Sequence, residues 1–166
     1  MAALTVGSAA PGFSLRWFQA GQGESFTLPK QGSTVLVFFK VSCPTCQYAV
    51  PFFDRLYRNK IEGHGANVSV VAVSQDNERD TRAFVQQFHI SMPIALDSNG
   101  YEASRGYGLT NVPTTFLICD GKVEFSSVGW SKQDAEEINA RVANLVDGVP
   151  VPLFKPGEEV ASFKAG

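Results

Sequence analysis

Two cysteines, Cys43 and Cys46, are the residues of this sequence whose type and spacing point most directly to chemistry. The apolar run at 35–39 predicts a strand buried on both faces, and a helical pattern begins at Cys43. The first turn of a helix carries a partial positive charge and unpaired N–H groups, and both favour a thiolate. We therefore expect Cys43 to be a nucleophile and Cys46, one turn along the same face, to resolve the mixed disulfide.

A stabilising disulfide and a zinc site are two other uses of such a pair. A disulfide that closes so short a loop would contribute only about 2 kcal/mol. A structural zinc site needs four ligands. The remaining candidates are Cys119, in an apolar run, and His64 and His89, which show no ligand spacing. The pattern favours redox chemistry by the dithiol itself, with no metal and no further cofactor.

Strands are expected to alternate with helices along the first two thirds of the chain. The predicted elements are a hairpin of 13–17 and 25–28 about Gly21-Gln22-Gly23, strands at 35–39, 68–73 and 93–96, and helices after Cys43, at 76–88 and at 102–107. The inward residues expected of the first two helices are Val50, Phe53, Leu56 or Tyr57, then Phe84, Val85 and Phe88. Asp76 or Asn77 is expected to cap the second helix.

The last third predicts a second hairpin and a final helix. Strands at 114–118 and 123–128 are joined across Asp120-Gly121, a strong turn signal. The helix is expected to begin at Ser131 with Asp134 completing a variant capping box. Its expected inward face consists of Ala135, Ile138, Val142 and Leu145. The order of elements predicts an α/β fold in which a central mixed sheet is flanked by helices on both faces. We expect one domain over 1–146 and a Pro-rich tail, 147–166, packed on its surface.

Composition excludes several classes of partner. The chain has 166 residues and a net charge of −2, with no basic cluster of the kind that binds nucleic acid or anionic membranes. Its apolar runs fall far short of the ~20 residues of a membrane span. Residues 1–7 lack the features of a signal peptide. We therefore expect a cytoplasmic protein, or an extracytoplasmic one if a leader has been removed, and a monomer.

The run from Val35 to Cys46 resembles the active-site segment of the thioredoxin superfamily. Pro51, eight residues after Cys43, matches the proline inside the helix of many thioredoxins, and Val112-Pro113-Thr114 resembles their cis-proline signature. The N-terminal hairpin and the strand and helix at 68–90 are similar to the TlpA/ResA-like or redoxin (AhpC/TSA-like) branch. The resemblance spans about residues 8–146.

The resemblance implies a thioredoxin-like fold and a thiol–disulfide oxidoreductase. It implies that Pro113 is cis beside the two sulfurs and that the Val112 backbone pairs with an incoming peptide, with Pro44 and Thr45 also contacting substrate. The expected partners are protein or small-molecule disulfides and thiols, together with an upstream reductant.

Three positions depart from the family pattern. Ser42 replaces the Trp that usually precedes the first cysteine, and Val37 and Ala49 replace carboxylates that could accept the proton of the resolving thiol. Water or a group distant in sequence must then serve, and Glu102 is one candidate. Lys40, three residues before Cys43, could further stabilise the thiolate.

Two other functions are compatible with this type of fold. Peroxiredoxins carry Pro-x-x-x-Thr-x-x-Cys, and the corresponding positions here are Leu36 and Lys40, so a peroxidase is disfavoured. A non-catalytic peptide-binding module would commonly lose one or both cysteines, and this chain keeps both. The neutral Thr45 does not indicate a strong oxidant, so we expect the reductase direction.

Overall fold

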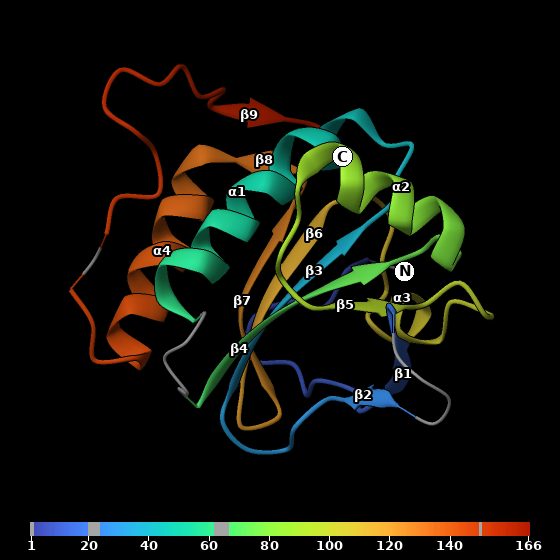
Figure 1. Cartoon of the computed structure of the whole chain (residues 1–166). Coiled ribbons are helices and arrows are strands. Elements are labelled where there is room, and N and C mark those ends of the chain that lie inside the picture. Colours follow the sequence, from blue (N-terminus) through green and yellow to red (C-terminus); the bar gives the residue numbers. More distant parts are fainter. Residues whose placement is uncertain (1, 20–23, 62–66, 150) are drawn as a thin grey trace.

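A seven-stranded mixed sheet forms the centre of the molecule, in the order β2-β1-β5-β4-β3-β6-β7 (Figure 1). The computed structural model describes residues 2–19, 24–61, 67–149 and 151–166. The strands of this sheet are β1 (Ser14–Trp17), β2 (Ser25–Thr27), β3 (Ser33–Phe39), β4 (Val68–Ser74), β5 (Ile94–Leu96), β6 (Thr114–Cys119) and β7 (Lys122–Val128). The helices are α1 (Pro44–Lys60), α2 (Glu78–Phe88), α3 (Glu102–Gly106) and α4 (Lys132–Leu145).

The pairing of the three central strands decides which residues meet. β3 pairs in parallel with β4 and antiparallel with β6. The carboxyl ends of β3 and β4 and the amino end of β6 therefore lie at one edge of the sheet. The segments that follow β3 and β4, and the one that precedes β6, converge there, although they are far apart in sequence.

Two apolar cores lie on the two faces of the sheet. The first contains buried residues of α1, α2 and α4, including Phe53, Phe84 and Ile138. The second contains Phe13 of the N-terminal segment, Ala103 of α3 and Tyr107, which follows α3. β3 contributes to both cores because its successive side chains point to opposite faces, with Val37 in the first and Phe38 in the second. The prediction of a sheet covered on both faces is confirmed.

Local signals explain where the later helices begin. The side chain of Asn77 caps α2 by accepting the Asp80 N–H (2.9 Å). Ser131 caps α4 by accepting the Asp134 N–H (3.2 Å). The Asp134 carboxylate accepts a hydrogen bond from the Ser127 hydroxyl (2.6 Å). It thereby ties α4 to β7, a contact that the capping-box pattern did not foresee.

The predicted hairpins are also present. Asp120 and Gly121 both have positive φ, of 48° and 77°, as the tight turn between β6 and β7 requires. β1 pairs antiparallel with β2, while the predicted Gly21-Gln22-Gly23 turn lies outside the described residues, as does His64.

One predicted core position is wrong. Leu145 is 43% exposed. It is the last residue of α4, and the neighbouring Ala143 is buried instead. Helical spacing alone predicts that Leu145 points inward, but this spacing carries no information about what packs at the end of the helix.

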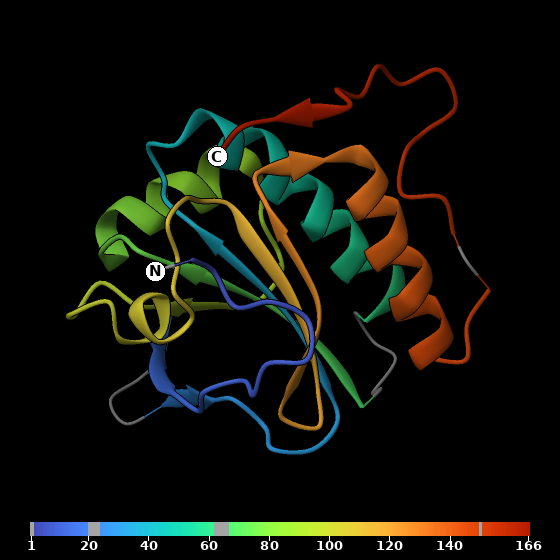
Figure 2. The same cartoon turned by 180° about the vertical axis from the view of Figure 1, so that it is seen from behind.

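The segment that follows α4 returns across the helices toward the start of α1 (Figure 2). Leu153 is buried in the first core, only 4% exposed. A short strand, β9 (Phe163–Lys164), pairs antiparallel with β8 (Trp130–Ser131) to form a separate two-stranded sheet. Within the described ranges, no helix is long and apolar enough to cross a membrane.

Candidate active site

Cys43 is the N-cap of α1, at the edge of the sheet where β3 ends. Its Sγ accepts a hydrogen bond from the Cys46 N–H at 3.2 Å, and Pro44 occupies the first turn, where the missing N–H costs nothing. The Cys43 N–H donates to the Lys40 carbonyl (3.2 Å). A sulfur in the N-cap position faces unpaired N–H groups, and this arrangement favours a negative charge on it.

The two cysteines differ sharply in exposure. Cys46 is completely buried, whereas Cys43 is partly accessible, and both are free thiols in this structure. Burial raises the pKa of Cys46, and its hydrogen bond with Cys43 and the negative charge of Asp76 raise it further. Cys46 is therefore held as a protonated thiol beneath an accessible partner, as a nucleophile and its resolving thiol require.

The segment before β6 completes the site. The Val112–Pro113 peptide bond is cis. The Val112 carbonyl accepts a hydrogen bond from Cys43 Sγ at 3.4 Å. Because β6 is the antiparallel neighbour of β3, with Thr114 opposite Phe38, the residues just before β6 must lie beside Cys43. The structure thus brings Cys43, Cys46, Val112 and Pro113 together.

The remaining predicted residues occupy more peripheral positions. Pro44 is exposed, and Thr45 is partly exposed with its hydroxyl donating to the Ala165 carbonyl (2.6 Å). The side chain of Lys40 is exposed at the end of β3. Glu102 is exposed on α3, and the next residue, Ala103, packs in the core on the opposite face of the sheet from Cys46. Cys119 accepts a hydrogen bond from the Ser33 hydroxyl (3.3 Å) at the other end of the strands.

Asp76 is a residue of the site that the sequence reasoning assigned only as a possible helix cap. Its carboxylate accepts the N–H of Val41, two residues before Cys43, at 2.8 Å. Asp76 follows β4 at the edge where β3 also ends. The signal was present, because two consecutive buried parallel strands place the residues that follow them side by side. The carboxylate whose negative charge acts on Cys46 is Asp76.

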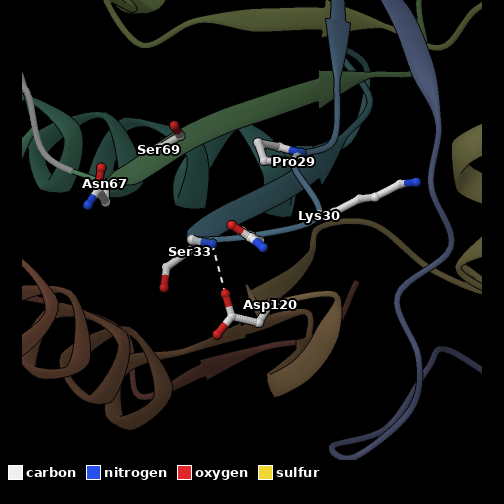
Figure 3. A pocket seen from close by; sticks show the side chains of 8 residues that line it. Pro29, Lys30, Ser33, Asn67, Ser69 and Asp120 are labelled. Carbon is white, nitrogen blue, oxygen red and sulfur yellow. Dashed lines mark hydrogen bonds between the residues drawn. The ribbon is translucent and has the colours of Figure 1, made fainter.

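A polar pocket lies at the other end of the strands (Figure 3). It has a volume of about 820 Å³ and is lined by polar side chains that include Ser33, Ser69 and Asp120. Asp120 accepts the Gly32 N–H there at 2.9 Å. Ser33 begins β3 and Cys43 follows its end, so this cavity has no part in the cysteine site. The hydrogen bond between Gly32 and Asp120 links the β6–β7 turn to the start of β3.

A comparison with known families finds that residues 6–126 match the AhpC/TSA family. The chain belongs to the AhpC/TSA family. The chain is 30% identical over 115 residues to the sporulation thiol-disulfide oxidoreductase A of Bacillus subtilis, and the match covers 65% of this chain and 67% of that protein. It is 31% identical over 121 residues to the thiol-disulfide oxidoreductase ResA of Halalkalibacterium halodurans, covering 70% of this chain and 66% of the relative.

A solved structure assigned as the thiol:disulfide interchange protein DsbE of Chlorobium tepidum superposes with a TM-score of 0.71 at 28% identity. The match covers 87% of this chain and 99% of that one. The predicted thioredoxin-like fold is confirmed, and so is the predicted reaction class, that of a thiol–disulfide oxidoreductase.

The raised pKa of Cys46 links folding to pH in the reduced protein. As the pH rises above the ordinary thiol pKa, Cys46 loses its proton in the unfolded state but keeps it in the folded state. The contribution of Cys46 to the free energy of unfolding is therefore fully present below that pKa and falls above it. Between pH 7 and 9.5 the free energy of unfolding should fall by about 1.4 kcal/mol more in the natural sequence than in Cys46→Ala.

Urea denaturation of both proteins, kept reduced, measures this difference. The window stops below pH 10 because burial also raises the pKa of Tyr107, which would contribute above that pH. Equal pH slopes in the two proteins would contradict a buried protonated Cys46.

Proposed function

We propose that this protein reduces disulfides in extended polypeptide substrates, with Cys43 as the attacking thiolate and Cys46 as the resolving thiol. The observation that carries the proposal is the N-cap position of the Cys43 sulfur, 3.2 Å from the Cys46 N and 3.4 Å from the Val112 carbonyl oxygen. One face of this sulfur is stabilised by the helix, and another adjoins a backbone segment that can pair with a peptide.

The proposed cycle transfers two electrons. The Cys43 thiolate attacks one sulfur of the substrate disulfide, forms a mixed disulfide and releases the first substrate thiolate, which takes up a proton. Cys46 then loses its proton, attacks the Cys43 sulfur and releases the second substrate thiol. Cys43 and Cys46 are left as a disulfide, which an external dithiol of unknown identity must reduce.

Residues around the pair serve distinct parts of this cycle. We assign substrate contact to Val112 and Pro113, which lie at the Cys43 sulfur just before β6, and to Pro44 and Thr45 in the first turn of α1. Lys40 could add positive charge near the thiolate from its exposed position. A cytoplasmic location and a monomeric state are part of the proposal.

The reductase direction is tested by the reduction potential of the Cys43–Cys46 pair. A value near −250 mV, within the range of thioredoxin-like reductases, supports the proposal, and one near −120 mV would make the protein an oxidant. The same preparation should catalyse the reduction of insulin disulfides by an external dithiol. A peroxidase is disfavoured because Leu36 is completely buried in β3 and Lys40 is exposed, where peroxiredoxins carry Pro and Thr.

Asp76 tunes the resolving step. Its negative charge contributes to the raised pKa of Cys46, so Asp76→Asn should lower that pKa while keeping an oxygen to accept the Val41 N–H. We expect the release of substrate from the mixed disulfide to become faster at pH 7, by a few-fold, because a larger fraction of Cys46 is ionised. Quenched-flow single turnovers over pH 6–9 measure this step. A slower release would instead assign Asp76 as the proton acceptor of Cys46.

A further inference from the structure

Residues 151–166, which we call the strap, run from α4 back to the redox site. Leu153 anchors the strap in the first core, and the Asn139 side chain donates to the Val151 carbonyl (2.8 Å). Arg55 of α1 forms two hydrogen bonds of 2.7 Å with the carboxylate of Glu158. Hydrogen bonds from Arg55 and from the Lys155 backbone lower the pKa of Glu158 to about 2, so this ion pair is charged at neutral pH.

The middle of the strap is fixed above the first turns of α1. The Ala161 N–H donates to the Tyr48 hydroxyl (2.9 Å), and the Ala161 carbonyl accepts from the buried Trp130 indole (2.7 Å). β9 then pairs with β8, and the ammonium group of Lys164 lies 4.9 Å from the centre of the Tyr48 ring. Such contacts give this segment a defined path toward Cys43.

The end of the strap, residues 163–166, lies on the groups assigned above to substrate contact. The Thr45 hydroxyl donates to the Ala165 carbonyl (2.6 Å), and the Asn111 side chain donates to the Gly166 carbonyl (3.2 Å). A Cβ atom on Gly166 would lie only 2.8 Å from the Val112 carbonyl oxygen. That oxygen is the one to which Cys43 Sγ donates its hydrogen bond.

The underlying surface has room for the strap because of a glycine. Gly129, which follows β7, has a φ of +78°, and a Cβ atom there would lie 2.7 Å from the Lys164 carbonyl oxygen and 3.1 Å from the Gly166 nitrogen. The N–H of Gly129 also donates to the Pro113 carbonyl (2.7 Å). The backbone beside the cis-proline and the backbone of the strap thus approach closely with no side chain between them.

We propose that the end of the strap is a built-in competitor for the peptide-binding edge of the redox site. It lies in an extended conformation against the segment before Pro113, so a substrate polypeptide must displace it before a disulfide reaches Cys43. That the strap competes with a polypeptide substrate rests on the proposed function. That the strap shields Cys43 does not. The reactivity of Cys43 toward large reagents is then proportional to the fraction of molecules in which the strap is displaced.

Alkylation of Cys43 in the fully reduced protein tests this shielding without any assay of activity. The full chain is compared with a variant that lacks residues 163–166, using iodoacetamide and a bulky polyethylene-glycol maleimide, with the labelled cysteine mapped by mass spectrometry. If the strap is closed about nine-tenths of the time, the deletion should speed maleimide labelling of Cys43 by about tenfold. The rate of labelling by the smaller iodoacetamide should increase less.

Gly166→Leu provides a second variant of full length, because its side chain would collide with the Val112 carbonyl, and it should also speed labelling. Phe163→Ala is the matched control, since the Phe163 side chain is 63% exposed, and it should leave the rate unchanged. A synthetic peptide of residues 160–166, at the millimolar effective concentration of a tethered segment, should slow labelling of the deletion variant again.

Labelling rates within twofold of one another in all four proteins would overturn the strap proposal. Insulin reduction separates the two proposals. Faster labelling of the deletion variant with no insulin reduction in any protein would leave the strap in place and refute the reductase. If the full chain and the deletion variant reduced insulin at equal rates and were labelled at equal rates, the reductase would be supported and the strap proposal refuted.

Discussion

Replacing Cys43 by serine is expected to lower the rate of insulin-disulfide reduction by about a thousandfold or more. The serine hydroxyl can still accept the Cys46 N–H, so the first turn of α1 should remain intact. It cannot attack a disulfide, however, because the nucleophile of thiol–disulfide exchange is a thiolate. Cys46 cannot take its place, since it is completely buried and its pKa is raised.

Cys119→Ser is the matched control for this substitution. Cys119 is the third free thiol, and it lies at the opposite end of β6 from Pro113. Its replacement should leave insulin reduction within twofold of the natural rate. If instead Cys43→Ser kept most of its activity and Cys119→Ser lost it, the site would have been placed at the wrong end of the sheet.

Replacing Cys46 by alanine should trap the reaction half-way. Cys43 keeps its position and exposure, so the first attack proceeds and the mixed disulfide forms, but no internal thiol can release the substrate. Steady-state turnover should fall by about a hundredfold or more. A stable adduct on Cys43, with the mass of the bound substrate, should be detected by intact mass spectrometry and lost on adding excess dithiol.

The double variant Cys43→Ser with Cys46→Ala provides the control for trapping, because it should form no adduct. An adduct that mapped to Cys119 would show that trapping is non-specific. In Cys46→Ala, the absence of any adduct combined with normal turnover would mean that Cys46 has no part in resolution.

Most of the fold could be predicted because its signals are local. The buried run of β3, the glycine at the β6–β7 turn and the caps of α2 and α4 each depend on a few neighbouring residues, and each was identified within a residue or two. The inward position of Leu145 failed because burial at the end of a helix depends on what packs there, and periodicity carries no such information.

The reactive pair could likewise be predicted, because a helix N-terminus and a spacing of three residues define it. Two features of the site depend on contacts between distant segments, which local patterns do not encode. Asp76 reaches Val41 only because β3 and β4 are parallel neighbours. Residues 163–166 reach Val112 only because the strap is anchored along its length by Leu153, Arg55 and Trp130.

The most direct test of the account is the order in which the two cysteines of the pair react. Brief treatment of the reduced protein with substoichiometric iodoacetamide at pH 7, followed by peptide mapping, should label Cys43 at least about a hundredfold more than Cys46, because reactivity follows thiolate character and exposure. Equal labelling, or preferential labelling of Cys46, would contradict the assignment of an exposed nucleophile above a buried, protonated partner.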